Sequence, residues 1–386
     1  MTVNFSTCCL LLVPGTWLLT TQIAECDDQE LLRVISRTGP QGVGSSAARA
    51  ACDELAQRDV GFLPSLLTAM DTSNPVAANW YRTVYREIVA RGLCSSGTPW
   101  PTAFFKKYVS DGQRRGKPRR LALSLVDRLD PDFRNHWLPS RLTDPEFRTE
   151  AIALVISAGD QALADKDKQT AKVRFEEAFQ YARDRSQVTQ SAERLRSIGE
   201  TADVIRHLGL VTDWWLTGPF DAPGKTGFAL MFEPENGIDL NSEYHGQNKA
   251  TFGWTRHRTT DALGQLNLVD ALGKTDEAVA YAWTEIFVER GQKAELRCSA
   301  DDCCLVWLNE EIVSPYEQWL NGTRFDRFAD AVTLVTGRNT ILVKVCQGPQ
   351  HRNPEVFNNW SLQLRLCDDE GRGISFQNAL ADIPAE

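Results

Sequence analysis

The sequence predicts a multidomain chain in which a helical-repeat solenoid is followed by an antiparallel β-sandwich. Two observations support this fold class. From Asp27 to about Leu208, apolar residues recur at the i, i+3, i+4 and i+7 spacing of helices that pack against a core. From Asp213 to Asp368, short alternating runs rich in Val, Leu, Trp and Phe are separated by clusters of Gly, Asn and Asp, which is typical of antiparallel strands.

The composition sets limits on function. With 386 residues, 42% hydrophobic and 24% charged, the chain has the profile of an ordinary globular protein. The net charge of −9 disfavours nucleic-acid binding, because phosphate contacts need a positive surface. We interpret the basic run Gly112–Arg120 as a solvated loop leading into a helix, with a patch for an anionic ligand as the alternative. No apolar run after the N-terminus is long enough for a membrane span, so none is expected in the mature chain.

The N-terminus predicts export. The apolar segment Cys8–Thr20 has the length of a signal-peptide core and a cleavage site follows Ala24, so we assign residues 1–25 to a signal peptide. The preceding segment has no Lys or Arg and Gln22 is large for its position, which departs from the usual pattern. Lipidation of Cys26 is the alternative. We expect the mature chain in the periplasm, at the cell surface or outside the cell.

Export also affects how the cysteines are interpreted. The chain has 10 cysteines, and removal of Cys8 and Cys9 leaves eight, an even number that predicts disulfides of open connectivity in an oxidising compartment. Their spacing does not form paired CxxC motifs, so zinc is not expected. The eight are Cys26, Cys52, Cys94, Cys298, Cys303, Cys304, Cys346 and Cys367.

The helical domain is expected over residues 27–208. The predicted helices begin near Asp28, Ser45, Asn74, Lys117 and Thr143, each after a turn or cap signal. Proline lies near three of these starts, where its missing N–H has no helical partner to lose.

Two segments of this domain resemble known repeats. Residues 144–167 resemble a HEAT repeat, with an Asp-Pro entry, a mid-helix Arg and a following Ala. The segment Ala171–Gly199 resembles a tetratricopeptide hairpin, because small residues (Ala171, Ala178 and Ala182) alternate with the aromatic residues Phe175, Phe179 and Tyr181. The resemblance implies a right-handed helical array whose grooves bind a protein partner.

The strand-rich part is expected over residues 211–373, followed by a C-terminal tail of residues 374–386. The predicted strands are residues 214–218, 279–288, 293–299, 303–309, 311–314, 331–336, 340–347 and 359–367. Many short strands at such spacing favour a sandwich or jelly roll.

Three stretches carry a more specific resemblance: "WWLTGPFD", "CSADDCCLVWLNEEIV" and "GRNTILVKV" with a closing "WSLQLR". Together they resemble the galactose-binding-like jelly roll of secreted bacterial proteins, with a hairpin of the PA14 type "SDDG-x-x-VWLNG-x-x-V". This resemblance implies a β-sandwich, but the scaffold hosts sugar-binding, protein-binding and structural roles.

The central stretch Leu296–Glu311 is predicted to be a hairpin whose turn is Ser299–Asp302. Because side chains alternate along a strand, Cys303 and Cys304 are expected on opposite faces. At most one of them can pair with Cys298 across the hairpin.

The resemblance implies one metal. In carbohydrate-binding relatives, adjacent aspartates of this hairpin hold a calcium ion that also contacts sugar hydroxyls, which here would be Asp301 and Asp302. Cys303 departs from the pattern, which has Gly there. The alternative is that both aspartates are turn residues, with no cofactor bound.

Candidate ligand-binding residues lie in two loops. The loop Ser314–Arg327 contains aromatic and hydrogen-bonding side chains of the kind that bind sugars, namely Tyr316, Gln318, Trp319, Asn321 and Arg324. A second rim, Tyr244–Trp254, supplies Trp254. By contrast, we assign the in-strand residues Trp214, Trp283, Trp307 and Trp360 to the core or to the cover of a sheet.

No catalytic motif is recognisable, so a non-enzymatic role is expected. We expect an exported binding or scaffold protein whose β-sandwich binds a glycan or cell-envelope polymer and whose helical repeats bind a protein partner. The alternative is a protein–protein assembly module at the cell surface. A third hypothesis is an accessory part of a glycoside-processing enzyme.

Overall fold

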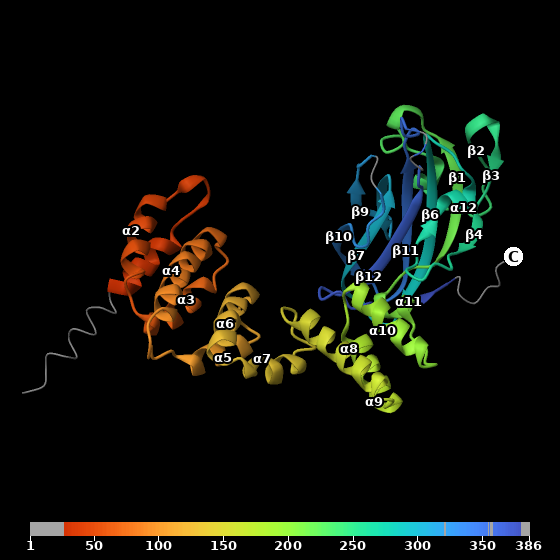
Figure 1. Cartoon of the computed structure of the whole chain (residues 1–386). Helices are drawn as coiled ribbons and strands as arrows, with labels where there is room; N and C mark the ends of the chain where they lie inside the picture. The colour runs from red at the N-terminus through yellow and green to blue at the C-terminus, as the bar shows by residue number, and fades with distance from the viewer. Residues whose placement is uncertain (1–26, 320–321, 354, 356–357, 380–386) are drawn as a thin grey trace, which may run out of the picture. The chain divides into compact units, whose positions relative to one another are not determined.

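The computed structural model describes residues 27–319, 322–353, 355 and 358–379. The expected signal peptide, Cys26, Asn321 and the last residues of the tail lie outside the described residues. Helices occupy the N-terminal half and antiparallel sheets the C-terminal half, as the sequence predicts (Figure 1). The chain divides into two units, Met1–Ser140 and Arg141–Glu386. The last helices therefore belong to the same unit as the sheets.

The first unit is helical. Asn74 caps α4, because its side-chain oxygen accepts hydrogen bonds from the backbone of Val76 and Ala77 at 3.0 and 3.3 Å. Residues 27–36 are also helical. The helices are α2 (Ser45–Leu55), α3 (Leu63–Met70), α4 (Pro75–Leu93), α5 (Thr102–Ser110), α6 (Gly116–Leu129) and α7 (Asp132–Trp137), with short 3-10 turns at η1 (Pro40–Gly42), η2 (Val60–Phe62) and η3 (Leu138–Ser140).

The second unit begins with α8 (Arg148–Ala164), α9 (Lys168–Tyr181), α10 (Arg185–Ser197) and α11 (Val204–Leu208). The small residues Ala171, Ala178 and Ala182 are buried. Phe175 packs so near Gly159 that a Cβ at Gly159 would lie 2.5 Å from its ring. The expectation that Arg148 lies in the middle of a helix is wrong, because Arg148 is the first residue of α8. Its side chain donates a hydrogen bond to the carbonyl of Leu142 at 3.2 Å. Its buried guanidinium binds backbone carbonyls of the segment that precedes the helix.

The strands fall into two larger sheets and a small one. One sheet has the order β4-β1-β6-β11-β8-β9 with β13 also paired to β6, another has the order β10-β7-β12-β5, and β2 pairs with β3. The strands are β1 (Asp213–Asp221), β2 (Tyr244–His245), β3 (Thr251–Phe252), β4 (Thr255–Arg258), β5 (Leu266–Asn267), β6 (Ala278–Val288), β7 (Gln292–Asp301), β8 (Cys303–Leu308), β9 (Glu311–Tyr316), β10 (Phe328–Leu334), β11 (Gly337–Gln347), β12 (Ser361–Cys367) and β13 (Gln377–Asn378). The connections include η4 (Pro223–Lys225), η5 (Glu233–Asn236), η6 (Gln247–Lys249) and α12 (Leu268–Leu272).

Each face of the larger sheet has its own apolar cluster. One cluster contains residues from both larger sheets, among them Trp214, Val306 and Leu364. The second cluster lies on the opposite face of the larger sheet and contains Trp283 and Leu342. Because side chains alternate along a strand, the two faces of β6, β8 and β11 contribute to different clusters.

The predicted hairpin at Ser299–Asp302 is wrong. β7 pairs with β10 and β12, whereas β8 pairs with β11 and β9, so the two strands belong to different sheets. Asp302 alone separates them and carries the chain from one sheet to the other. The predicted alternation is confirmed: Cys304 lies in the cluster shared by the sheets and Cys303 in the cluster on the outer face.

The cysteines give no support to the predicted disulfides. Those in the described part of the chain are free thiols, buried except for Cys94. Burial raises the pKa of Cys303 to about 12, so its thiol stays protonated at neutral pH. Among the described residues, no helix has both the length and the apolar character needed to cross a bilayer.

Candidate functional site

A row of apolar side chains crosses the outer face of the larger sheet. The strand register places Trp215 opposite Trp283, Trp283 opposite Leu342, Leu342 opposite Trp307, and Trp307 opposite Ile312. We call these five residues the outer-face row. Neighbouring strands are about 5 Å apart, so the backbones of Trp283 and Trp307 are separated by about 10 Å with Leu342 between them. Ile312 at the end of the row is 57% exposed.

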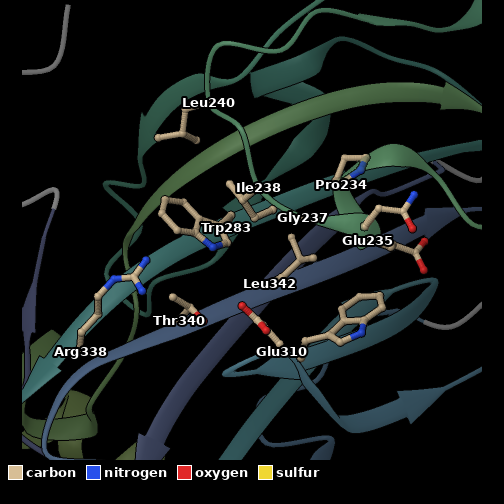
Figure 2. Close-up of a pocket in the computed structure, with 12 residues that line it drawn as sticks. Pro234, Glu235, Gly237, Ile238, Leu240, Trp283, Glu310, Arg338, Thr340 and Leu342 are labelled. Carbon is tan, nitrogen blue, oxygen red and sulfur yellow. The ribbon is translucent and has the colours of Figure 1, made fainter.

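A cavity of about 440 Å³ lies over the middle of this row (Figure 2). Its volume is in the range of small-molecule sites. Trp283, Leu342 and Trp307 contribute the apolar surface from the strands, and the segment after η5 contributes Ile238 and Leu240. The remaining lining residues are Pro234, Glu235, Asn236, Gly237, Glu310, Arg338 and Thr340.

A buried lysine holds the segment that forms one side of the cavity. Lys344 is 1% exposed, and its ammonium donates to the carboxylate of Glu235 at 2.8 Å and to the carbonyls of Phe228 and Leu230. Tyr281 donates to the same oxygen of Glu235, and burial followed by this carboxylate raises the pKa of Tyr281, which stays protonated. All three ammonium hydrogens thus have acceptors, as a buried charge requires.

Two charged residues stand at the edge of the cavity. Glu310 is exposed and lies in the two-residue turn between β8 and β9, where Asn309 and Glu310 have φ of 51° and 71°. Arg338 donates through Nε to Glu285 at 2.7 Å, which orients the guanidinium beside the sheet. In Figure 2, Thr340 lies between Arg338 and Glu310.

This arrangement can bind a ligand that has both an apolar face and hydroxyl groups. Indole rings accept the C–H face of such a ligand by dispersion and stacking contacts. The carboxylate of Glu310 accepts hydrogen bonds, the guanidinium of Arg338 donates them, and the amide of Asn236 can do both. The cavity has one negative and one positive side chain at its edge beside the two tryptophans. This balance of charge suits a neutral polar ligand better than an ion.

The two aspartates proposed as metal ligands are adjacent to this face. Asp301 and Asp302 are 6% and 2% exposed and are joined by a cis peptide bond. Oδ2 of Asp302 accepts from the backbone of Gly348 at 2.9 Å. Burial, then the hydrogen bond and negative charge of Asp302, raise the pKa of Asp301 to about 8, against the opposing charge of Arg327.

The aspartate pair suits calcium in charge but supplies few ligands. Two buried carboxylates, one of which (Asp301) has a raised pKa, favour a hard cation that can replace the proton of Asp301. Calcium takes about six to eight oxygen ligands, however, and no group of three or more His, Cys, Asp or Glu suited to a metal occurs among the described residues. Backbone or solvent oxygens would have to complete the coordination.

Trp319 is brought to the same place as Asp302. A Cβ at Gly348 would lie 2.8 Å from Oδ2 of Asp302 and 3.3 Å from Cε3 of Trp319. The indole ring and the carboxylate therefore both pack against this glycine. The indole N–H of Trp319 donates to Glu317 at 3.1 Å, and the Lys225 ammonium lies 5.8 Å from the ring centroid.

The other predicted ligand residues have structural partners. Tyr316 stacks on Phe328 with ring centroids 3.8 Å apart, and its hydroxyl donates to Asp330 at 2.8 Å. The side-chain oxygen of Gln318 accepts from Arg327 at 2.7 Å. Arg324 is exposed, and its backbone N–H donates to Ser299 at 2.9 Å.

Trp254 is enclosed. It is 7% exposed, and its indole N–H donates to the hydroxyl of Tyr244 at 3.0 Å. Its ring is therefore not open to a ligand in this structure, whereas Asn321 lies outside the described residues. Ligand binding by the loop residues stays a prediction.

The sequence-based search missed Trp283, Trp307 and Glu310. The two tryptophans were assigned to the core or a sheet cover, and Trp283 is in fact only 9% exposed. The sequence did contain a signal for Trp307, because this residue lies between the apolar residues Val306 and Leu308 of the same strand and must therefore face the opposite side of the sheet. Glu310 follows Asn309 in a two-residue turn, where glycine is preferred.

Comparisons with known proteins give the following results. No protein-family model matches the chain, and no curated protein matches it. Among solved structures, it is similar to a β-glucosidase from Kluyveromyces marxianus in complex with glucose, with a TM-score of 0.26 and 12% identity over 40% of this chain and 16% of that chain. It is also similar to the PA14 domain of the antifreeze protein MpAFP, with a TM-score of 0.21 and 13% identity over 29% and 60% of the two chains.

A third similarity is to a GH31 α-xylosidase from Xanthomonas citri, with a TM-score of 0.20 and 15% identity over 41% and 18% of the two chains. The chain thus spans less than two thirds of the length of each of these structures. At such TM-scores the similarities carry no argument about function, so the functional proposal depends on the geometry of the cavity and of the aspartate pair.

Proposed function

We propose that this chain is an exported, non-catalytic protein that binds a glycan or cell-envelope polymer through its strand-rich unit. The observation that carries the proposal is the cavity over Trp283 and Trp307, which combines aromatic surface with donors and acceptors. In this proposal the two larger sheets form a galactose-binding-like sandwich, and the outer face of the larger sheet is the binding face.

A saccharide fits the cavity better than a purely apolar ligand does. A pyranose has one C–H face for an indole ring, and its hydroxyls need several hydrogen-bonding partners at the edge. Glu310 and Arg338 supply an acceptor and a donor on the two sides of Thr340 (Figure 2). The two tryptophan positions, about 10 Å apart across the strands, leave room for more than one sugar ring.

Calcium is a second element of the proposal. Asp301 and Asp302 would hold the ion through their carboxylates, and Trp319 beside Asp302 would offer a ring to the sugar that the ion contacts. When bound, the ion would supply positive charge for sugar hydroxyls. Glycan binding at the cavity over Trp283 and Trp307 needs no such ion, so the two sites can be tested separately.

The helical part would serve as a scaffold for a protein partner, with its helices forming the predicted solenoid. Leu154 on α8 and Val173 on α9 are 42% and 48% exposed, and these two helices pack on each other. In this proposal, Leu154 and Val173 lie in the surface that contacts the protein partner.

The test is a glycan array probed with the full mature chain, with calcium and with EDTA, followed by calorimetry on any glycan that binds. Trp307→Ala should weaken binding at least tenfold, because an aromatic contact is lost. The matched control is Phe287→Ala: Phe287 is 40% exposed on the same strand as Trp283, but it does not line the cavity. Asp301→Asn should remove only the part of binding that calcium supports.

Three outcomes would count against the proposal. A folded chain that binds no glycan on the array favours the alternative, a protein–protein assembly module. Equal losses in the Trp307 and Phe287 variants would show that the cavity is not the site. Hydrolysis of a chromogenic glycoside by the purified chain would contradict a non-catalytic role and favour an accessory part of a glycoside-processing enzyme.

A further inference from the structure

A second cavity in the strand-containing unit is lined by arginines. It has a volume of about 630 Å³ and lies where the C-terminal end of α9, the short helix α11 and the stretch after β12 meet. We call it the arginine cavity. Its lining residues are Phe179, Gln180, Tyr181, Arg183, Asp203, Arg206, His207, Arg372, Gly373 and Ser375.

The cavity concentrates positive charge in an acidic chain. Arg183, Arg206 and Arg372 line it together with one carboxylate, Asp203, although the net charge of the chain is −9. Asp203 is already engaged, because its side chain accepts from the backbone of Arg206 at 2.9 Å and caps α11. Burial, followed by the charges of Arg372 and Arg148, lowers the pKa of Arg183, and the carboxylates of Asp368 and Glu370 oppose this shift.

The guanidinium groups keep donors available. Arg183 donates through one terminal nitrogen to the carbonyls of Gln180 and Ala182 at 2.9 and 2.7 Å, which fixes the group at the end of α9. Its buried Nε has no hydrogen-bond partner among the described residues. The nearest carboxylate oxygen to Arg372 belongs to Asp368 at 4.0 Å, too far for a hydrogen bond.

One side of the cavity is uncharged. His207 donates through Nε2 to the carbonyl of Ala182 at 2.8 Å, and its ring lies against Phe179 with centroids 4.4 Å apart. Burial and the surrounding arginines lower the pKa of His207, so the imidazole is neutral at pH 7. A ligand therefore meets aromatic surface beside the arginines as well as positive charge.

We propose that the arginine cavity binds an oxyanion group carried by a larger molecule. Guanidinium groups form charge-assisted, often paired hydrogen bonds to phosphate, sulfate or carboxylate oxygens, and the three arginines that line the cavity would provide them. The cavity is too large for a lone ion, and the ring surface of Phe179 and His207 suits the attached organic part. This site is distinct from the cavity over Trp283 and Trp307, which we call the tryptophan cavity, and does not depend on glycan binding there.

The test is calorimetric titration of the full mature chain at constant ionic strength with sodium phosphate, sodium sulfate and sodium glucuronate, with glucose as the uncharged probe. We expect saturable binding of at least one anion and none of glucose. Preference for phosphate and sulfate would identify a tetrahedral oxyanion, and preference for glucuronate a carboxylate on a sugar. Arg206→Gln and Arg372→Gln, both at exposed side chains, should each weaken binding about tenfold.

Arg174→Gln is the matched control. Arg174 is exposed on α9, pairs with Glu177 on the same helix and does not line the cavity, so its loss should leave anion binding unchanged. Thermal unfolding of each variant shows that it is folded. Absence of saturable binding with any of the three anions, or equal losses in the Arg174 variant and the cavity variants, would overturn the proposal.

Discussion

Glu310 occupies a backbone conformation that few residues other than glycine adopt. Its φ of 71° follows the positive φ of Asn309, the pattern of tight hairpin turns in which Asn-Gly is favoured. A side chain at such a position costs stability, of the order of 1 kcal/mol. The carboxylate that this residue places at the edge of the tryptophan cavity offers a reason for a non-glycine residue here.

Glu310→Gly should therefore change stability and glycan binding in opposite directions. Glycine accepts the positive φ, so the variant should be more stable by up to about 1 kcal/mol, or about 2–4 °C in melting temperature. Glycan affinity should fall, because an acceptor at the cavity is lost. Calorimetry and thermal unfolding on the same preparations measure both. Glu311→Gly, at the next residue and the first of β9, is the control and should not raise the stability.

At the scale of single residues, the sequence pointed to the aspartate pair and Trp319 as candidates but did not point to the cavity. Asp301 and Asp302 were proposed because the sequence around them resembles the PA14-type hairpin. An outward-facing tryptophan such as Trp283 cannot be told from a covered one by alternation alone, since both have the same phase along the strand. Whether a loop covers it depends on residues distant in sequence, here the segment held by Lys344.

At the scale of elements, the longer strands were predicted, but their partners and the short strands β2, β3, β4, β5 and β13 were not. Each of the predicted strands coincides with an observed one, because a period of two is a local property of the chain. The connection at Asp302 was misread because a short polar gap between two strands is shared by a hairpin and by a change of sheet. Which of the two occurs is decided by long-range pairing, here of β7 with β12 and of β8 with β11.

The buried carboxyl of Asp301, beside the change of sheet, makes the stability of the fold depend on pH. The carboxyl of Asp301 has a pKa raised to about 8 in the fold, against about 3.9 in an unfolded chain. The folded state therefore binds the proton more tightly, so this contribution to stability is fully present below about pH 4 and is lost as the pH rises towards 8.

Asp301→Asn removes this dependence, because the amide cannot ionise and keeps the shape of the protonated acid. In EDTA the variant should be more stable than the parent by about 1 kcal/mol or more at pH 8, and the gain should shrink towards pH 5. Denaturant unfolding at a series of pH values measures it. Asp369→Asn, at an exposed loop aspartate, is the control. A gain independent of pH would contradict the assignment.

At the scale of the whole molecule, the strand-rich unit includes the helices that precede it. The backbone of Val211 donates to Leu364 at 3.0 Å, and the backbone of Gly373 donates to His207 at 3.2 Å. The buried guanidinium of Arg365 donates to the carbonyl of Leu208 at 3.1 Å. The change of sequence period near Leu208 predicted where helices give way to strands, but it carries no information about which helices pack with the sheets.

A fragment that begins at Arg141 should consequently be more stable than one that begins at Val211. The shorter fragment loses the acceptors at His207 and Leu208, and each buried donor left without a partner costs about 1–3 kcal/mol. For a domain of this size the difference corresponds to about 5 °C or more in melting temperature. Thermal unfolding of the two purified fragments measures it. Equal melting temperatures would show that α8–α11 contribute nothing to the fold of the sheets.

Lys344 has a consequence for the thermodynamics of recognition. Its ammonium holds the carbonyls of Phe228 and Leu230 and the carboxylate of Glu235, and it thereby orders the segment that forms one side of the tryptophan cavity. Ordering a loop when a ligand arrives costs conformational entropy, about 1–2 kcal/mol for each residue fixed. Here that ordering is already complete in the folded chain, so the cavity is preorganised. Ligand binding should therefore lose little conformational entropy to loop closure.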